Sequence, residues 1–204
     1  MLVITSFTFG FVIMYISGMR PMEESRDAYL HECARLAYQK SLDDQVKDSL
    51  VSVCKLPEAD ARVYAEIIKN ASTRFNIDWR WLVAKLMVES TFDPFAISKA
   101  TRGSPREQLE SAYGLMQIKP STARDITKHL NFPWSGQAYL FNPYYSVMLG
   151  ACYMAELKVP LGNNFEATEK AYNNGIANYY AGKVSEEHWQ KVSEWHEKLK
   201  PRSK

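Results

Sequence analysis

Glu89 has the clearest potential for acid–base chemistry in this sequence of 204 residues. It ends an apolar stretch, residues 79–89, in which leucine, valine and methionine recur at helical spacing. Apolar neighbours and the negative end of a helix dipole both favour the neutral carboxyl, as a general acid requires. The alternative is an exposed ion pair between Lys85 and Glu89, one helical turn apart. Considered alone, this helix favours the ion pair.

Three short segments follow one another in an order that changes this preference. Residues 89–94 read Glu-Ser-Thr-Phe-Asp-Pro, residues 114–120 read Gly-Leu-Met-Gln-Ile-Lys-Pro, and residues 171–175 read Ala-Tyr-Asn-Asn-Gly. Together they resemble the successive motifs of the lytic transglycosylase (SLT, goose-lysozyme-like) domain family. The resemblance covers Pro57 to Leu199.

The resemblance implies a role for Glu89. It matches the family's catalytic glutamate, which protonates the glycosidic oxygen and then, as a carboxylate, removes the proton of the sugar's C6 hydroxyl to close a 1,6-anhydro ring. A two-carboxylate glycosidase would need a second acid. Asp93 is the only candidate nearby in the sequence, and its place before Pro94 is typical of a turn residue. We therefore expect the family's substrate-assisted route.

The resemblance also implies a set of substrate-binding residues: Ser90, Ser98, Met116, Gln117, Tyr172 and Asn173. For several of them a structural role is the alternative: capping after the helix for the two serines, core packing for the Met116 side chain, and bracing of the following turn for Asn173. Because the segment from Ser98 to Gly114 is longer than expected, Ser104 is a second candidate for the family serine. Among the aromatic residues around the expected groove, we add Tyr180 as a sugar contact.

Two positions depart from the family pattern or leave it open. Lys119 stands where soluble members often have methionine, so the groove wall is expected to differ. A later glutamate of the family corresponds to either Glu186 or Glu187.

The helical signals predict a mainly α fold. We expect a lysozyme-like (goose-type/SLT) helical domain over residues 57–204 with at most a small β-hairpin, because no alternating strand longer than a few residues occurs. N-cap residues before the apolar runs, such as Asp78 and Asn142, mark where helices begin. Residues 20–56 are expected to form a linker, at 21–26, and an accessory helical segment.

An uncharged apolar segment, residues 1–19, opens the chain. It predicts a signal peptide or a membrane anchor, and hence an exported protein in the periplasm or cell envelope; a buried core helix is the alternative. Arg20 follows this segment. Because positive charge beside an apolar segment tends to stay in the cytoplasm, Arg20 does not favour export of the rest of the chain. Cleavage and membrane association through this segment both remain open.

Composition limits the other classes of function. The formal net charge is +2 without a long basic run, which argues against nucleic acid as a partner. The histidines and cysteines lack metal-ligand spacing and no phosphate loop is present, so neither metal nor cofactor is expected. Cys33 and Cys54 could pair in an oxidising compartment, whereas Cys152 lies in an apolar helical run. We expect a monomer that acts on peptidoglycan glycan strands.

The sequence thus predicts an enzyme that cuts the bond between N-acetylmuramic acid and N-acetylglucosamine to give 1,6-anhydromuropeptides. A hydrolytic goose-type lysozyme is one alternative. An inactive glycan-binding module of a secretion or wall-spanning assembly is the other.

Overall fold

The computed structural model describes residues 5–98, 111–130 and 134–201. By the contacts within the chain it divides into two units, residues 1–44 and residues 45–204. Helix α1 (Thr5–Ser52) belongs to both and runs without a break through residues 21–26, where the sequence predicts a linker. Met22, Glu23 and Glu24 are good helix formers, which favours the continuous helix despite Pro21.

The second unit is built from helices, as predicted. These are α2 (Glu58–Phe75), α3 (Trp79–Glu89), α5 (Pro120–Leu130), the 3₁₀ helix η1 (Gln137–Phe141), α6 (Pro143–Lys158), α7 (Phe165–Asn174), α8 (Ile176–Tyr180) and α9 (Glu186–Lys198). Within the described residues, β-structure is limited to isolated bridges of Tyr113 with Ile97 and with Ile118. The expected hairpin is therefore reduced to single residue pairs.

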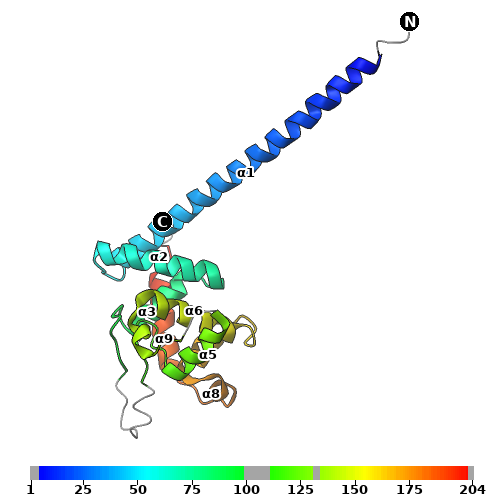
Figure 1. The fold of residues 1–204 in the computed structure, drawn as a ribbon. Coiled ribbons are helices and arrows are strands. Elements are labelled where there is room, and N and C mark those ends of the chain that lie inside the picture. The colour runs from blue at the N-terminus through cyan, green and yellow to red at the C-terminus, as the bar shows by residue number, and fades with distance from the viewer. Residues whose placement is uncertain (1–4, 99–110, 131–133, 202–204) are drawn as a thin grey trace. The chain divides into compact units, whose positions relative to one another are not determined.

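Helix α6 forms the centre of the core (Figure 1). It packs against α2, α5, α7 and η1, and it starts where the sequence indicates, because Asn142 accepts a hydrogen bond from the Tyr145 amide at 3.0 Å. Val147, Leu149 and Met154 on this helix are fully buried. A helix that is apolar on nearly all sides must be enclosed by other elements, so α6 fixes the positions of the helices around it.

Helices α3 and α9 pack against each other (Figure 1). Helix α9 also packs against α7. Trp81 of α3 stacks on His196 of α9, with ring centroids 3.6 Å apart and planes 6° from parallel. The same tryptophan stacks on Phe165 and Trp189. This aromatic cluster holds the helix that carries Glu89 against the C-terminal helix.

The cysteine thiols are free in this structure. Cys33 is exposed and Cys54 is half-buried, while Cys152 is buried, as its apolar surroundings predict. Burial raises the pKa of both Cys54 and Cys152 to about 12, so both remain protonated at neutral pH.

Candidate active site

Helix α3 delivers Glu89 to the site from a well-defined start. The Asp78 side chain accepts a hydrogen bond from the Arg80 amide at 2.9 Å and caps the helix, as predicted. The helix ends at Glu89, and the next residue, Ser90, donates from its hydroxyl to the Leu115 carbonyl at 3.0 Å. Ser90 therefore ties the end of α3 to the segment that forms the opposite wall.

That wall is a tight turn over residues 114–117. Gly114 has φ +71°, and a Cβ atom on it would lie 1.9 Å from the Leu140 carbonyl oxygen, so no other residue type fits. Gln117 also adopts a left-handed backbone, with φ 45°. Its side-chain amide donates to the carbonyls of Ala96 and Gly114, at 3.1 Å and 2.8 Å. These bonds fix the orientation of the Gln117 side chain.

Met116 connects the turn to the core. Its side chain is fully buried and lies on Gly150 of α6, where a Cβ would approach the Met116 side chain to 2.5 Å. Its carbonyl accepts a hydrogen bond from the Tyr172 hydroxyl at 2.9 Å. The Met116 side chain thus packs in the core, which was the structural alternative for this residue, and its backbone anchors Tyr172.

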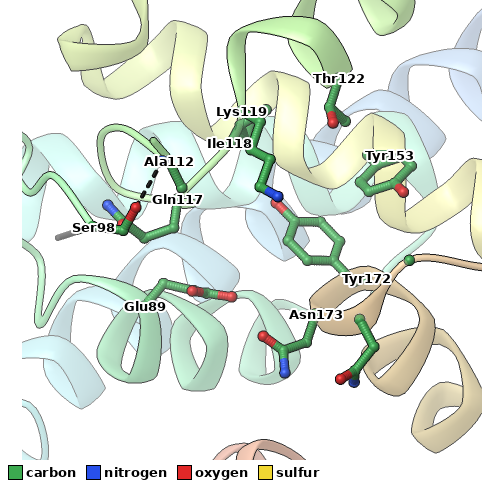
Figure 2. Close-up of a pocket in the computed structure, with 12 residues that line it drawn as sticks. Glu89, Ser98, Ala112, Gln117, Ile118, Lys119, Thr122, Tyr153, Tyr172 and Asn173 are labelled. Carbon is green, nitrogen blue, oxygen red and sulfur yellow. Dashed lines mark hydrogen bonds between the residues drawn. The ribbon is translucent and has the colours of Figure 1, made fainter. Parts of the chain in front are cut away.

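The turn, α3 and α7 enclose a cleft of about 390 Å³. Figure 2 shows its side chains converging from these elements, with Glu89 and Gln117 on one side and Tyr172 on the other. The lining residues are Glu89, Ser98, Ala112, Gln117, Ile118, Lys119, Thr122, Tyr153, Tyr172, Asn173, Asn174 and Gly175.

Five of the eight predicted site residues line this cleft: Glu89, Ser98, Gln117, Tyr172 and Asn173. Ser98 also accepts a hydrogen bond at its hydroxyl from the Ala112 amide, at 2.8 Å. Ser90 and Met116 lie behind the wall as supports. Tyr180 is 65% exposed and is not among the lining residues. The competing serine, Ser104, falls outside the described residues.

The bracing expected of Asn173 is performed by its neighbour. Asn174 donates from its side chain to the Lys170 carbonyl at 2.9 Å and accepts from the Ser185 amide at 3.4 Å. Asn173 instead points into the cleft (Figure 2).

The Glu89 carboxylate contacts two basic side chains through one oxygen. Lys85 Nζ donates to Glu89 Oε1 at 2.9 Å, and His188 Nε2 of α9 lies 3.3 Å from the same oxygen. Within the described chain no hydrogen bond or ion pair involves Oε2. The Glu89 side chain is 13% exposed and lines the cleft, so Oε2 is the oxygen that remains available to a ligand.

Lys85 belongs to a larger buried network. Its ammonium group also donates to Glu169 Oε2 of α7 at 2.9 Å, and both of these side chains are fully buried. The same ammonium lies over the Tyr172 ring, 3.6 Å from its centroid. The Tyr172 hydroxyl bonds to the Met116 carbonyl, and the link from Tyr172 to Glu89 runs through Lys85.

The expectation of a raised pKa for Glu89 is wrong. Burial does raise it, but the charge of Lys85, with the contact to His188, outweighs burial and lowers the pKa below its ordinary value. For Lys85 the signs are reversed: burial lowers the pKa, but Glu169 and Glu89 together outweigh burial and raise the pKa above its ordinary value. The ion pair of Lys85 with Glu89, which was the alternative from the sequence, is present but buried, and His188 adds a contact from a distant helix. Glu89 is a carboxylate in the resting protein.

The sequence-based site omitted Glu169, His188 and Tyr153. Glu169 precedes Tyr172 by three residues, so the two share a face of α7, and this spacing was the available signal. His188 had no signal beyond its residue type. It follows the two glutamates considered for the family's later acid, Glu186, which binds Lys170, and Glu187, which binds Lys191.

Of the cleft-lining residues that the structure describes, Glu89 is the only carboxylate. Asp93 accepts a hydrogen bond from the Phe95 amide at 2.9 Å, as the turn interpretation predicts. In the described ranges, no group of three histidine, cysteine, aspartate or glutamate side chains could hold a metal ion.

Comparison with known proteins identifies the family of the chain. The family model for the transglycosylase SLT domain matches residues 66–195. Membrane-bound lytic murein transglycosylase C of Mannheimia succiniciproducens is 38% identical over 102 residues, which cover 48% of this chain and 25% of that protein. The protein of the same name from Actinobacillus pleuropneumoniae serotype 5b is 34% identical over 103 residues, covering 50% and 26%. The chain thus spans about a quarter of the length of these relatives.

Solved structures support the fold. The 70 kDa soluble lytic transglycosylase SLT70 of Escherichia coli superimposes with a TM-score of 0.51 at 23% identity, over 82% of this chain and 28% of that one. An inactive mutant of the lytic transglycosylase Slt of Pseudomonas aeruginosa gives 0.52 at 20% identity, over 81% and 27%. With the family model matching more than half of its residues, this chain belongs to the transglycosylase SLT domain family.

Proposed function

We propose that this chain is a peptidoglycan lytic transglycosylase that cleaves the β-1,4 bond from N-acetylmuramic acid to N-acetylglucosamine without water. One observation carries the proposal: among the described residues that line the cleft, the single carboxylate is Glu89, between Gln117 and Tyr172. A two-carboxylate hydrolase would need a second acid across the bond. The two relatives compared above, which each match about half of this chain, are named lytic murein transglycosylases.

Glu89 acts first as an acid and then as a base. The protonated carboxyl gives its proton to the glycosidic oxygen as the bond to C1 breaks, and the N-acetyl oxygen of the muramic acid residue shields the oxocarbenium-like carbon. The Glu89 carboxylate then takes the proton of the C6 hydroxyl, whose oxygen closes the 1,6-anhydro ring on C1. Lys85 and His188 contact Oε1 and stabilise the carboxylate formed between the two steps.

The remaining lining residues hold the sugars. Because the Gln117 amide nitrogen is occupied by two carbonyls, its oxygen is the group offered to a hydroxyl or amide of the substrate. Ser98 and Asn173 add polar contacts, and Tyr172 adds a ring. Ser90 and Met116 act through the wall that they support. Tyr180, exposed beyond the lining residues, offers a ring face to a further sugar.

The cellular place follows from the substrate. A wall-cleaving enzyme must be exported, and we propose that the apolar segment of residues 1–19 serves as its signal or anchor. Among the helices that the structure describes, none combines the length and apolarity needed to cross a membrane. The relatives compared above are named membrane-bound.

Digestion of purified sacculi by the purified protein, with mass spectrometry of the products, tests the proposal. Muropeptides with 1,6-anhydro ends are the expected result. Reducing ends would show a hydrolytic lysozyme instead. Binding of sacculi without any released fragment would show an inactive glycan-binding module, and either outcome would overturn the proposal.

A further inference from the structure

We propose that His188 is a positioning residue that holds the catalytic proton in the resting enzyme and passes it to Glu89 when substrate binds. This inference rests on the proposed function. It addresses a requirement of that chemistry, because Glu89 must carry a proton to act as an acid but is a carboxylate while the cleft is empty.

The geometry of His188 suits this task. Its Nε2 lies 3.3 Å from Glu89 Oε1, and its side chain is 16% exposed. Both ring nitrogens are buried and, within the described chain, neither makes an aligned hydrogen bond, so the approach of Nε2 to Glu89 Oε1 is an ion-pair contact that the ring must align before a proton can pass. No third group in the described chain holds the ring in another orientation.

The other groups around Glu89 are committed elsewhere. Lys85 donates to two carboxylates, and loss of its proton would leave Glu169 buried beside a neutral amine. The Tyr172 hydroxyl donates to the Met116 carbonyl, and burial raises its pKa well above the ordinary value. His188 is the remaining titratable side chain in contact with the Glu89 carboxylate.

The charges on the packed helices permit the transfer. The charged groups that contact α9 near His188 are Glu89 of α3, which meets His188, and Lys170 of α7, which meets Glu186. Lys85 links Glu89 to Glu169 and to the Tyr172 ring. When Glu89 becomes neutral, Lys85 remains paired with Glu169, so no unpaired buried charge results. Lys170 stays bound to Glu166 and Glu186. Glu169 thus makes protonation of Glu89 tolerable.

The transfer itself is balanced. The Nε2–H bond of the imidazolium breaks and an O–H bond forms on Glu89 Oε1, so that an ion pair becomes a neutral pair. Substrate that excludes water from the cleft favours the neutral pair, because burial disfavours separated charges. The Glu89 carboxyl torsion is broad, and rotation about it presents the proton to the glycosidic oxygen. The C6 hydroxyl later returns one proton, so the enzyme needs none from solvent.

The pH dependence of kcat/KM on solubilised glycan strands tests this role. In the unaltered enzyme kcat/KM should not change with pH over the range in which Glu89 and His188 together hold one proton. In His188→Gln, Glu89 must take its proton from solvent, so kcat/KM should fall about tenfold per pH unit, or about 100-fold from pH 5 to pH 7. His196→Gln, the same change elsewhere on α9, should keep the level profile. A His188→Gln profile that is merely scaled down would overturn the proposal.

A second measurement does not depend on activity. When the full chain is titrated, the carbon NMR shifts of the Glu89 carboxyl and of the His188 ring should change at a common pH. Glu89→Gln should move the pH at which the ring shift changes, and His188→Gln should abolish the change of the carboxyl shift at that pH. Independent titration of the two groups would overturn the proposal even if His188→Gln failed to fold. If the unaltered protein releases no muropeptides, the proposed function fails, whereas this titration still decides whether the pair shares a proton.

Discussion

Lys85 Nζ donates a 2.9 Å hydrogen bond to Glu89 Oε1, one helical turn along α3, from a side chain that is fully buried. Such a pair on a helix surface is worth only about 0.2–0.5 kcal/mol. Here the ammonium is also bound to Glu169 in the interior, so the removal of one partner leaves a charge without water or a counter-ion. The stability of the cleft therefore depends on Lys85.

Replacement of Lys85 by methionine should lower the free energy of unfolding by about 3–5 kcal/mol, because Glu169 would remain buried without its cation. Chemical denaturation followed by circular dichroism measures this change. The double variant Lys85→Met/Glu169→Leu should recover most of the loss, since it removes both buried charges. Equal destabilisation of the single and double variants would contradict the buried-pair interpretation.

The double variant has a second expected effect. Without the Lys85 charge, the pKa of the Glu89 carboxyl should rise, because burial raises it and Lys85 is the main group that lowers it. Carbon NMR of the Glu89 carboxyl measures the midpoint. An unchanged midpoint would show that Lys85 does not control the charge of Glu89.

Glu89→Gln should reduce the rate of muropeptide release by roughly 10²–10⁴-fold, because the amide cannot donate and recover a proton. Its fold should be retained, since the amide oxygen can still accept from Lys85, which stays paired with Glu169. Product release and the thermal midpoint should be measured together. Glu194→Gln, an exposed change on α9, is the matched control and should leave both unchanged.

Much of the fold was predictable because its signals are local. Asp78 and Asn142 cap their helices by bonds to amides two or three residues ahead, and such bonds depend on neighbouring residues alone. The apolar run that becomes α6 is buried for the same reason. The linker predicted at residues 21–26 is instead part of a helix, because the helix formers around Pro21 outweigh the effect of that proline.

Only those residues of the candidate site that belong to the sequence motifs could be predicted. The motif residues Glu89, Gln117 and Tyr172 meet in one cleft, but the charge state of Glu89 depends on contacts between distant parts of the chain. Lys85 and Glu169 are 84 residues apart in sequence, and His188 lies on the last described helix. Helical periodicity cannot predict such contacts, because they arise from how α7 and α9 pack on α3.

Gly114→Ala should destabilise the protein strongly, by more than about 2 kcal/mol, because the backbone is left-handed and the added Cβ would collide with the Leu140 carbonyl. The turn would have to move, and Gln117 with it. Gly162→Ala is a matched control, since Gly162 has a similar φ of +65° but open space around its Cβ. Denaturant midpoints of the two variants separate the collision from the backbone strain.

The stacked pair of Trp81 and His196 predicts a dependence of stability on pH. Burial lowers the pKa of His196, with Asp78 opposing, so the folded protein favours the neutral ring while the unfolded chain takes up a proton near the ordinary pKa of about 6.5. The stabilisation is complete above that pH and is lost as pH falls toward the lower folded pKa. The Glu89 carboxylate, whose pKa is lowered from 4.5, loses its contribution only at more acidic pH.

The thermal midpoint of the unaltered protein should therefore fall between pH 7 and pH 5. His196→Phe keeps an aromatic ring on Trp81 but cannot take up a proton, so its midpoint should fall less over the same interval. His31→Phe, a change at an exposed histidine of α1, should follow the unaltered protein. Parallel curves for the unaltered protein and His196→Phe would mean that the stacked imidazole does not titrate in this range, and that the packing of α9 on α3 is insensitive to its charge.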